Sequence, residues 1–414
     1  MLIYTKFGKR PNLEREGLID SYSELDAIFL THAHLDHVGS INKLFEQKGN
    51  TPMYASAATR DIAFLLLADL ISNNFNEFYD DNLNLDTYKQ LIIDKALTSI
   101  SIKKIDEKII SNNDEFEAKF YNAGHILGAR MLYINVNGYK VLFTGDFSEQ
   151  PQYTVPAYEL PKGLEVDLLV TENTYGNYNN TKAKDSNLEE IQLCKVINQS
   201  IKNHGNILFP VFAVGRAQEI ILYLDDLMKK GLIETVPIYI DATAKFSSKI
   251  YEKYGVNIYS ENIKDAEKSL IYNFKDHPCI VVTSSGMLMK GSKSYRYAEK
   301  MITEKNDLII FSGYLAFNST GNKLINAFRN NNEKFIINDK KINLNAAVYN
   351  IHKGAHATQS GTKELIEKVN AKNIILIHGN NSDFKDNNLY IDLHKKYEGR
   401  KNIHMGHNGF KIFI

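Results

Sequence analysis

Four candidate metal ligands lie within six residues near the start of the chain, in the segment Thr31-His32-Ala33-His34-Leu35-Asp36-His37-Val38-Gly39. The apolar run 26–30 before it is typical of a buried strand, so the ligands fall where a strand ends. His32 and His34 can reach one ion from an extended chain, whereas Asp36 and His37 lie on the following turn and can face a second. One or two histidines at a strand end are usually capping or core residues. Three histidines and an aspartate this close indicate a pair of adjacent metal sites.

Further histidines and carboxylates recur along the chain where apolar runs end. His125 lies in a glycine-containing loop, Asp146 follows the run 140–143, and Glu172 follows the run 166–170. Late in the chain, His356 precedes a helical pattern and His378 follows the run 373–377. Each of these alone is more often a loop histidine or a turn former. Because strand ends meet at one edge of an α/β sheet, together they predict one site.

The middle of the chain has a different organisation. A polar stretch over 177–186 is typical of a linker. After it, predicted strands at 206–210, 237–240, 280–283 and 308–311 alternate with helical patterns that include 243–254 and 294–303. This alternation predicts a parallel sheet covered by helices. We therefore expect a first domain over 1–176, an inserted domain over 177–344, and a final part of the first domain over 345–414.

Composition limits the class of protein. A length of 414 residues exceeds one ordinary core, which suits two domains or one domain with a large insertion. Lysine plus arginine and aspartate plus glutamate both number 49, so any positive groove must be local or supplied by bound metal ions.

The sequence also bears on the compartment. The two cysteines, Cys194 and Cys279, form neither a disulfide framework nor a thiolate metal site. The amino terminus does not read as a signal peptide, and the most apolar stretch, 62–71, is interrupted by Asp69. We expect a soluble cytoplasmic protein without a membrane partner.

Nine motifs, in order from residue 26 to 379, resemble the β-CASP group of metallo-β-lactamase-fold nucleases. They are His-x-His-x-Asp-His at 32–37, Ala-Gly-His at 123–125, Thr-Gly-Asp at 144–146, Glu-x-Thr-Tyr-Gly at 172–176, Pro-x-Phe-Ala-Val-Gly-Arg-Ala-Gln-Glu at 210–219, Ser-Ser-Gly-Met at 284–287, Gly-Tyr at 313–314, Ala-His-Ala at 355–357 and Ile-His-Gly at 377–379. The group includes ribonuclease J, the endonuclease of pre-mRNA 3′ cleavage, and short bacterial and archaeal RNA-processing relatives, which this chain resembles most. The resemblance implies an α/β fold, an αββα sandwich with an inserted β-CASP α/β domain.

The resemblance also implies roles for individual residues. Two zinc ions would be held by His32, His34 and His125 on one side, by Asp36, His37 and His378 on the other, and by a bridging Asp146. Manganese is also compatible with these ligand types. Two such ions can lower the pKa of a bridging water to roughly neutral. Glu172 and His356 would form a hydrogen-bonded pair, with His356 protonating the leaving oxygen, so that Asp36, Asp146, Glu172 and His356 carry the catalysis.

Loops of the inserted domain are expected to contact the RNA backbone, since hydroxyls and backbone amides can hold phosphates without reading sequence. The candidates are Ser284, Ser285, Gly286, Gly313, Tyr314 and Arg216. Ordinary turns are the alternative for these loops, and a domain interface is the alternative for Arg216. Single-stranded RNA is the expected substrate, because its bases are not locked in a duplex.

The resemblance predicts a zinc-dependent ribonuclease of RNA processing or decay, endonucleolytic because the extra domain of ribonuclease J is not recognised. The alternatives are a 5′-exoribonuclease, a DNA-repair nuclease of the same group, and a non-catalytic RNA-binding scaffold. Two departures from the family pattern stand out. The short amino terminus is expected to leave a sheet edge for a partner or for the second subunit of a homodimer to cover. Thr358 stands where the Ala-His motif often has an aspartate.

Overall fold

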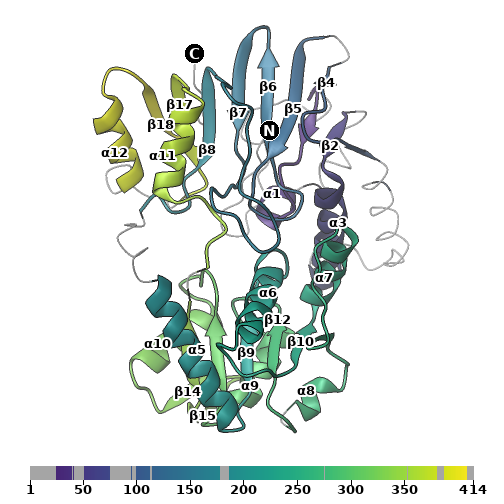
Figure 1. The fold of residues 1–414 in the computed structure, drawn as a ribbon, viewed down its shortest axis with the longest axis vertical. Helices are drawn as coiled ribbons and strands as arrows, with labels where there is room; N and C mark the ends of the chain where they lie inside the picture. The colour runs from purple at the N-terminus through teal and green to yellow at the C-terminus, as the bar shows by residue number, and fades with distance from the viewer. Residues whose placement is uncertain are drawn as a thin grey trace. The chain divides into compact units, whose positions relative to one another are not determined.

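The computed structural model describes residues 25–39, 41, 51–74, 95, 99–111, 114–177, 186–274, 276–351, 353–379 and 387–407. The chain forms two compact units (Figure 1). The first unit comprises Met1–Asn180 and Ala355–Ile414, and the inserted unit comprises Thr181–Gly354. None of the helices in the described ranges is long and apolar enough to cross a membrane.

The first unit contains two sheets. Three parallel strands form the smaller sheet, in the order β1 (Ile28–Phe29), β2 (Met53–Ala55) and β3 (Ile100–Ile102). The larger sheet has the order β18-β17-β8-β7-β6-β5-β4, with bounds β4 (Ile109–Ile110), β5 (Phe116–Asn122), β6 (Arg130–Val136), β7 (Tyr139–Phe143), β8 (Leu168–Glu172), β17 (Asn373–Ile377) and β18 (Asn402–Met405). Strands β4 to β7 pair antiparallel, whereas β7, β8, β17 and β18 are parallel.

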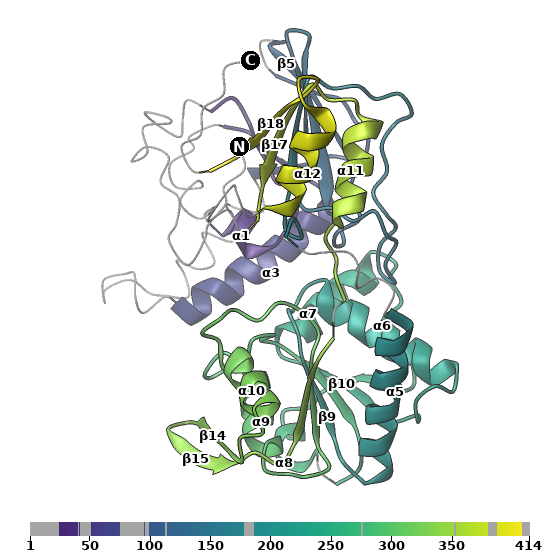
Figure 2. The same ribbon diagram turned by 90° about the vertical axis from the view of Figure 1, so that its left-hand side faces the viewer.

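An apolar layer joins the two sheets of the first unit. Phe29 of β1 packs edge-on against Phe116 and Phe120 of β5, at ring-centroid distances of 6.0 and 6.1 Å. Helices α11 (Gln359–Lys368) and α12 (Asn388–Tyr397) lie on one side of the sheets, and α1 (Leu35–Val38) and α3 (Ala57–Asn74) lie on the other (Figure 2). The predicted αββα sandwich is therefore confirmed.

The inserted unit is built on a six-stranded sheet of parallel strands in the order β11-β10-β12-β9-β13-β16. Its strands are β9 (Ile207–Pro210), β10 (Ile238–Asp241), β11 (Ile263–Asp265), β12 (Ile280–Thr283), β13 (Leu308–Phe311) and β16 (Ala347–Asn350), with a separate hairpin of β14 (Lys334–Ile337) and β15 (Lys340–Asn343). Its helices are α5 (Ser186–Lys202), α6 (Arg216–Lys229), α7 (Thr243–Lys253), α8 (Leu270–Asn273), α9 (Lys293–Met301) and α10 (Thr320–Arg329).

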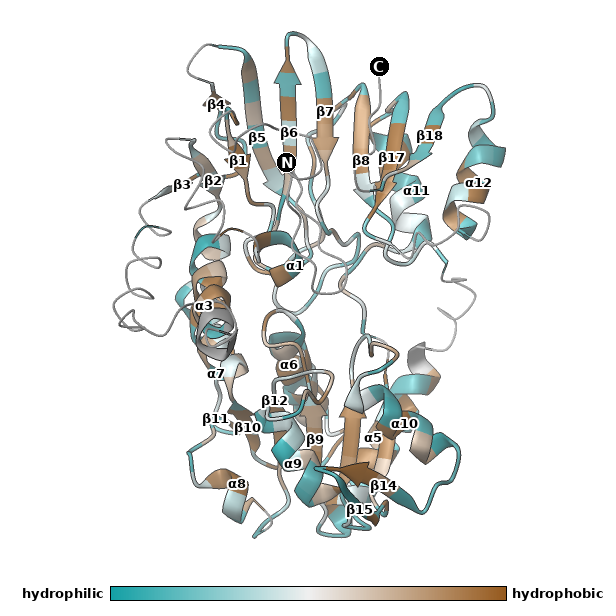
Figure 3. Ribbon diagram, turned by 180° about the vertical axis from the view of Figure 1, so that it is seen from behind, coloured by the Kyte–Doolittle hydropathy of each residue, from teal (hydrophilic) through white to brown (hydrophobic). Residues whose placement is uncertain are grey.

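The central strands of the inserted unit are apolar on both faces, as β9 shows in brown in Figure 3. Such runs are expected of parallel strands that have helices on both sides. One face packs in a single cluster with α9 and α10, and Figure 2 shows α5 and α6 on the other side. The predicted parallel sheet covered by helices is confirmed.

Strand β16 lies in the inserted unit, although the predicted return to the first domain is at residue 345. It pairs in parallel with β13, from Leu308 opposite Ala347 to Phe311 opposite Asn350. The chain therefore returns to the first unit at Ala355. The predicted sheet edge at the amino terminus lies outside the described residues.

A buried amide organises the start of α6. The side-chain oxygen of Gln218 accepts a hydrogen bond from the backbone N–H of Gly215 at 2.9 Å. Its nitrogen lies 3.1 and 3.0 Å from the hydroxyls of Ser247 and Ser248 on α7, and 3.2 Å from the carbonyl of Ala213. Gln218 is fully buried. Part of the 210–219 motif is therefore explained by the packing of α6 on α7.

We predict that Gln218→Leu lowers the free energy of unfolding by about 2 kcal/mol, because it leaves buried polar groups without partners. Urea denaturation followed by circular dichroism measures this change. Gln192 is exposed on α5, so Gln192→Leu is the matched control and should change stability little. Equal effects of the two substitutions would contradict a structural role for Gln218.

Candidate active site

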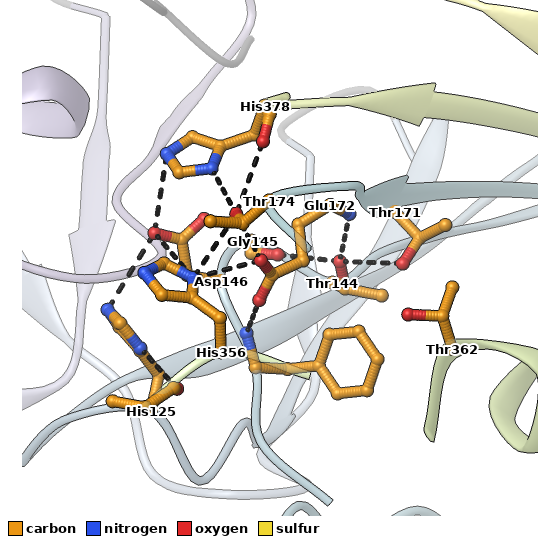
Figure 4. Close-up of polar contacts among 12 residues, drawn as sticks. His125, Thr144, Gly145, Asp146, Thr171, Glu172, Thr174, His356, Thr362 and His378 are labelled. Carbon is orange, nitrogen blue, oxygen red and sulfur yellow. Dashed lines mark hydrogen bonds and ion pairs between the residues drawn. The ribbon is translucent and has the colours of Figure 1, made fainter. Parts of the chain in front are cut away.

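The predicted ligands of the first unit meet at one edge of its sheets. His32 and His34 follow β1, while Asp36 and His37 lie on α1. His125, Asp146 and His378 follow β5, β7 and β17, and Glu172 ends β8. Because β5, β7, β8 and β17 run in the same direction, their carboxyl ends share this edge. His356 joins them from the segment before α11 (Figure 4).

The carboxylate of Asp146 is the common neighbour of these histidines. Its Oδ2 lies 3.5 Å from the Nε2 atoms of His32, His37 and His378, and 3.7 Å from that of His125. Asp146 is only 2% exposed. Burial raises the pKa of its carboxyl group, but the surrounding imidazoles, His378 first, outweigh burial and hold this pKa well below its usual range. Asp146 is therefore a buried anion that requires positive charge around it.

One group of possible ligands consists of His32, His34, His125 and Asp146, which offer ligand atoms within 4.8 Å of one another. Burial lowers the pKa of His32 and of His125 well below the usual value, so both imidazoles are neutral, the form that binds metal. The Nδ1–H of His125 donates to the carbonyl of Ala355 at 2.8 Å. This bond leaves Nε2 of His125 as a ligand atom, 3.1 Å from Nδ1 of His34.

A second group consists of Asp36, His37 and His378, also with ligand atoms within 4.8 Å of one another. Nε2 of His378 lies 3.2 Å from Oδ2 of Asp36, and Nε2 of His37 lies 3.8 Å from the same oxygen. Burial lowers the pKa of His378, but Asp146 and Asp36 raise it to about 10. The carboxylates thus favour positive charge at this position.

Several atoms of this site fit a bound cation. Within the part of the chain that the structure describes, Nε2 of His32, both ring nitrogens of His37 and Oδ1 of Asp146 are buried without a hydrogen-bond partner. Buried polar atoms are normally hydrogen-bonded, so such a cluster of unsatisfied imidazole and carboxylate atoms is expected where metal ions bind.

Glu172 and His356 form the predicted pair. Nδ1 of His356 donates to Oε2 of Glu172 at 2.9 Å, and the other oxygen, Oε1, accepts the backbone N–H of Phe147 at 2.7 Å (Figure 4). Burial lowers the pKa of His356, but the nearby carboxylate of Glu172 outweighs burial and raises it above the usual value. His356 can therefore carry a proton beside Asp146, whose Oδ2 is 3.8 Å away.

The structure adds one residue that the sequence did not identify. The hydroxyl of Thr174 donates to Oε2 of Glu172 at 2.5 Å and lies 2.8 Å from Nδ1 of His378 (Figure 4). With the hydroxyl proton given to Glu172, the Nδ1–H of His378 donates to Thr174, and Nε2 faces the two aspartates. The Glu-x-Thr-Tyr-Gly motif contains this threonine, but its spacing does not reveal which groups the hydroxyl joins.

The predicted RNA-contacting residues all lie in the inserted unit, in the segments that follow its neighbouring strands β12, β9 and β13, with Arg216 as the first residue of α6. A Cβ added to Gly286 would lie 2.9 Å from the backbone N of Phe212, and one added to Gly313 would lie 3.6 Å from the Phe212 ring. Both loops therefore pack against Phe212, four residues before Arg216. Tyr314 is 65% exposed. The structure thus brings Ser284, Ser285, Gly286, Gly313, Tyr314 and Arg216 to one end of the inserted sheet.

Comparison with known families gives three matches along the chain. Residues 23–166 match the metallo-beta-lactamase superfamily, residues 217–324 match the Beta-Casp domain, and residues 341–397 match the Zn-dependent metallo-hydrolase RNA specificity domain.

Relatives are similar over nearly the whole chain. An RNase J-like protein of Methanocaldococcus jannaschii is 33% identical over 86% of this chain and 82% of its own length. Cleavage and polyadenylation specificity factor 73 of Drosophila melanogaster is 29% identical over 91% of this chain, and endoribonuclease YSH1 of Yarrowia lipolytica is 30% identical over 92%. The chain spans only 55% and 46% of the length of these last two relatives.

Among solved structures, the fold resembles a protein of unknown function from Enterococcus faecalis V583. The TM-score is 0.54 at 13% identity, over 93% of this chain and 80% of that one. This likeness concerns the fold alone.

We predict that Thr174→Val weakens the binding of divalent metal by about 10- to 100-fold, because His378 loses the hydroxyl that orients its ring. Competition with a chelating dye measures the affinity. Thr174→Ser keeps the hydroxyl and should bind metal like the unaltered protein. An unchanged affinity in Thr174→Val would exclude this role.

Proposed function

Because the chain belongs to the β-CASP family of metallo-β-lactamase-fold nucleases, we propose that it is a zinc-dependent ribonuclease acting on single-stranded RNA in RNA processing or decay. The observation that carries this proposal is the position of Asp146. Its buried carboxylate faces imidazoles of both ligand groups and lies beside the Glu172–His356 pair. Such a site could bind two cations beside a histidine that can carry a proton.

The ligand sets follow from these distances. His32, His34 and His125 would hold one ion, Asp36, His37 and His378 would hold the other, and Asp146 would contact both. Two of the three groups whose ligand atoms lie within 4.8 Å of one another support this assignment, and the third joins Asp146 and His378 to Glu172 and His356. Imidazole and carboxylate ligands suit zinc, and manganese is compatible with the same set. When bound, two such ions supply an activated water and offset the charge that develops on the phosphate.

The chain's own residues would handle the proton and the substrate. His356 would give its Nε2 proton to the leaving oxygen, since its Nδ1–H is engaged by Glu172. Glu172 would keep the ring in place, because its other oxygen is fixed by the backbone of Phe147. Asp36 and Asp146 would serve the reaction as metal ligands. In the inserted unit, the loops that pack around Phe212 would hold phosphates, with Arg216 as a cation and Tyr314 as an exposed aromatic ring.

Cleavage within the RNA chain is the mode we propose. The similarity to a protein named endoribonuclease YSH1 extends over 92% of this chain and supports internal cleavage. The match of residues 341–397 to an RNA specificity domain supports RNA over DNA as the substrate.

We predict that the purified protein cuts a 5′-labelled, unstructured RNA into internal fragments, and that a chelator or Asp146→Ala abolishes the cleavage. The products are separated by gel electrophoresis beside a single-stranded DNA of the same sequence, and the zinc-to-protein ratio is measured on the same sample. Labelled mononucleotide would indicate a 5′-exonuclease, and faster cleavage of the DNA would indicate a DNA nuclease. Intact RNA at two zinc ions per chain would contradict ribonuclease activity and favour a scaffold.

We predict that His356→Ala keeps the metal content of the unaltered protein but lowers kcat by about 10²- to 10⁴-fold, because it removes proton transfer without removing a ligand. Metal analysis and single-turnover cleavage measure the two quantities. His277 is exposed in the inserted unit, so His277→Ala is the control and should change neither. Loss of metal from His356→Ala would show that His356 is a ligand.

A further inference from the structure

The loop that carries His356 is held at three points, each by a different segment of the first unit. The carbonyl of Ala355 accepts from His125, and the imidazole of His356 donates to Glu172. The third contact is made by Thr358, whose hydroxyl donates to Oε1 of Glu149 at 2.5 Å and whose backbone N–H lies 3.2 Å from Oε2. The proposed function gives no role to Glu149.

The carboxylate of Glu149 packs against the first turn of α11. Thr358 is the N-cap of this helix, and its Oγ1 accepts the backbone N–H of Gly361 at 3.0 Å. A Cβ on Gly361 would lie 2.4 Å from the carboxyl carbon of Glu149, so the carboxylate occupies the space that a side chain at position 361 would take. A negative charge at the amino end of a helix is also favoured by the helix dipole. Since Thr358 already caps the helix, Glu149 contributes a connection between two loops.

The other end of this connection is equally fixed. Glu149 lies three residues after Asp146, in the loop that follows β7. In this loop the N–H of Phe147 donates to Glu172, and the N–H of Ser148 donates to the carbonyl of Ala123 at 3.0 Å. The backbone around Asp146 is therefore tied to the loops of Glu172 and His125, and Glu149 extends this bonding to the loop of His356.

We propose that Glu149 is a positioning residue, which keeps the His356 loop aligned with Asp146 and Glu172. Its carboxylate reaches Thr358, the cap residue of α11, from another loop. The expected effect of Glu149 on catalysis rests on the proposed ribonuclease activity. Its expected effect on the order of the His356 loop does not.

Four variants of the full chain test the role of Glu149. Glu149→Ala removes the connection, and Glu149→Gln keeps an oxygen that can accept from Thr358. The double variant Glu149→Ala/Thr358→Asp restores a carboxylate cap on α11 without the connection, because aspartate is a good N-cap. Glu364 is exposed on α11, so Glu364→Ala is the matched control. The readouts are kcat and KM on single-stranded RNA, metal content, and hydrogen exchange of peptides covering 355–361.

Glu149→Ala is expected to lower kcat by about 10- to 100-fold at a nearly unchanged KM and metal content, because a misplaced proton donor slows the chemical step. Exchange over 355–361 should become faster. Glu149→Gln should restore most of the rate, the double variant should not, and Glu364→Ala should match the unaltered protein in every readout.

Two results would overturn the proposal. Unchanged exchange and kcat in Glu149→Ala would show that the connection does nothing, and full recovery in the double variant would show that Glu149 only caps α11. An unaltered protein that cleaves no RNA would instead contradict the proposed function. Hydrogen exchange would then still decide whether Glu149 orders the His356 loop.

Discussion

The buried carboxylate of Asp146 is the constraint on which the rest of the site depends. An ionised carboxylate buried away from water is costly unless positive charge compensates it. The four imidazoles within 3.7 Å of its Oδ2 would supply that charge mainly through the cations they would hold. The backbone makes this approach possible at Gly145, whose φ is +54° and whose Cβ, if present, would lie 2.9 Å from Cβ of Thr31. The glycine of the Thr-Gly-Asp motif thus lets the end of β7 lie against the segment that carries His32.

Much of this arrangement could be predicted from the sequence, because each ligand follows a recognisable apolar run and parallel strands end at a common edge. What could not be predicted depends on partners distant in the sequence. The predicted boundary at residue 345 is one case, because only the pairing of β16 with β13 assigns that strand to the inserted unit. The role of the Thr174 hydroxyl could not be predicted either, because its position in a motif does not show that it contacts both Glu172 and His378.

Some residues of a motif stabilise the fold and others are available to contact a substrate, and the sequence does not show which are which. Within the 210–219 motif, Gln218 is occupied by Gly215 and by the serines of α7, whereas Phe212 packs against Gly313 with 40% of its surface exposed. The same holds for the departure at Thr358. Its hydroxyl donates to the carboxylate of Glu149, a residue of another loop.

The pairing of β8 with β17 has a consequence for how the protein is made. Leu168 pairs with Asn373, and the whole inserted unit lies between them in the chain. During synthesis, β8 therefore emerges long before its neighbour, while the inserted unit, whose parallel sheet is complete in itself, can fold first. Until β17 arrives, one edge of β8 lacks its strand, and such edges invite aggregation. His378 also emerges last among the proposed ligands, so the proposed metal centre can be completed only after this residue has emerged.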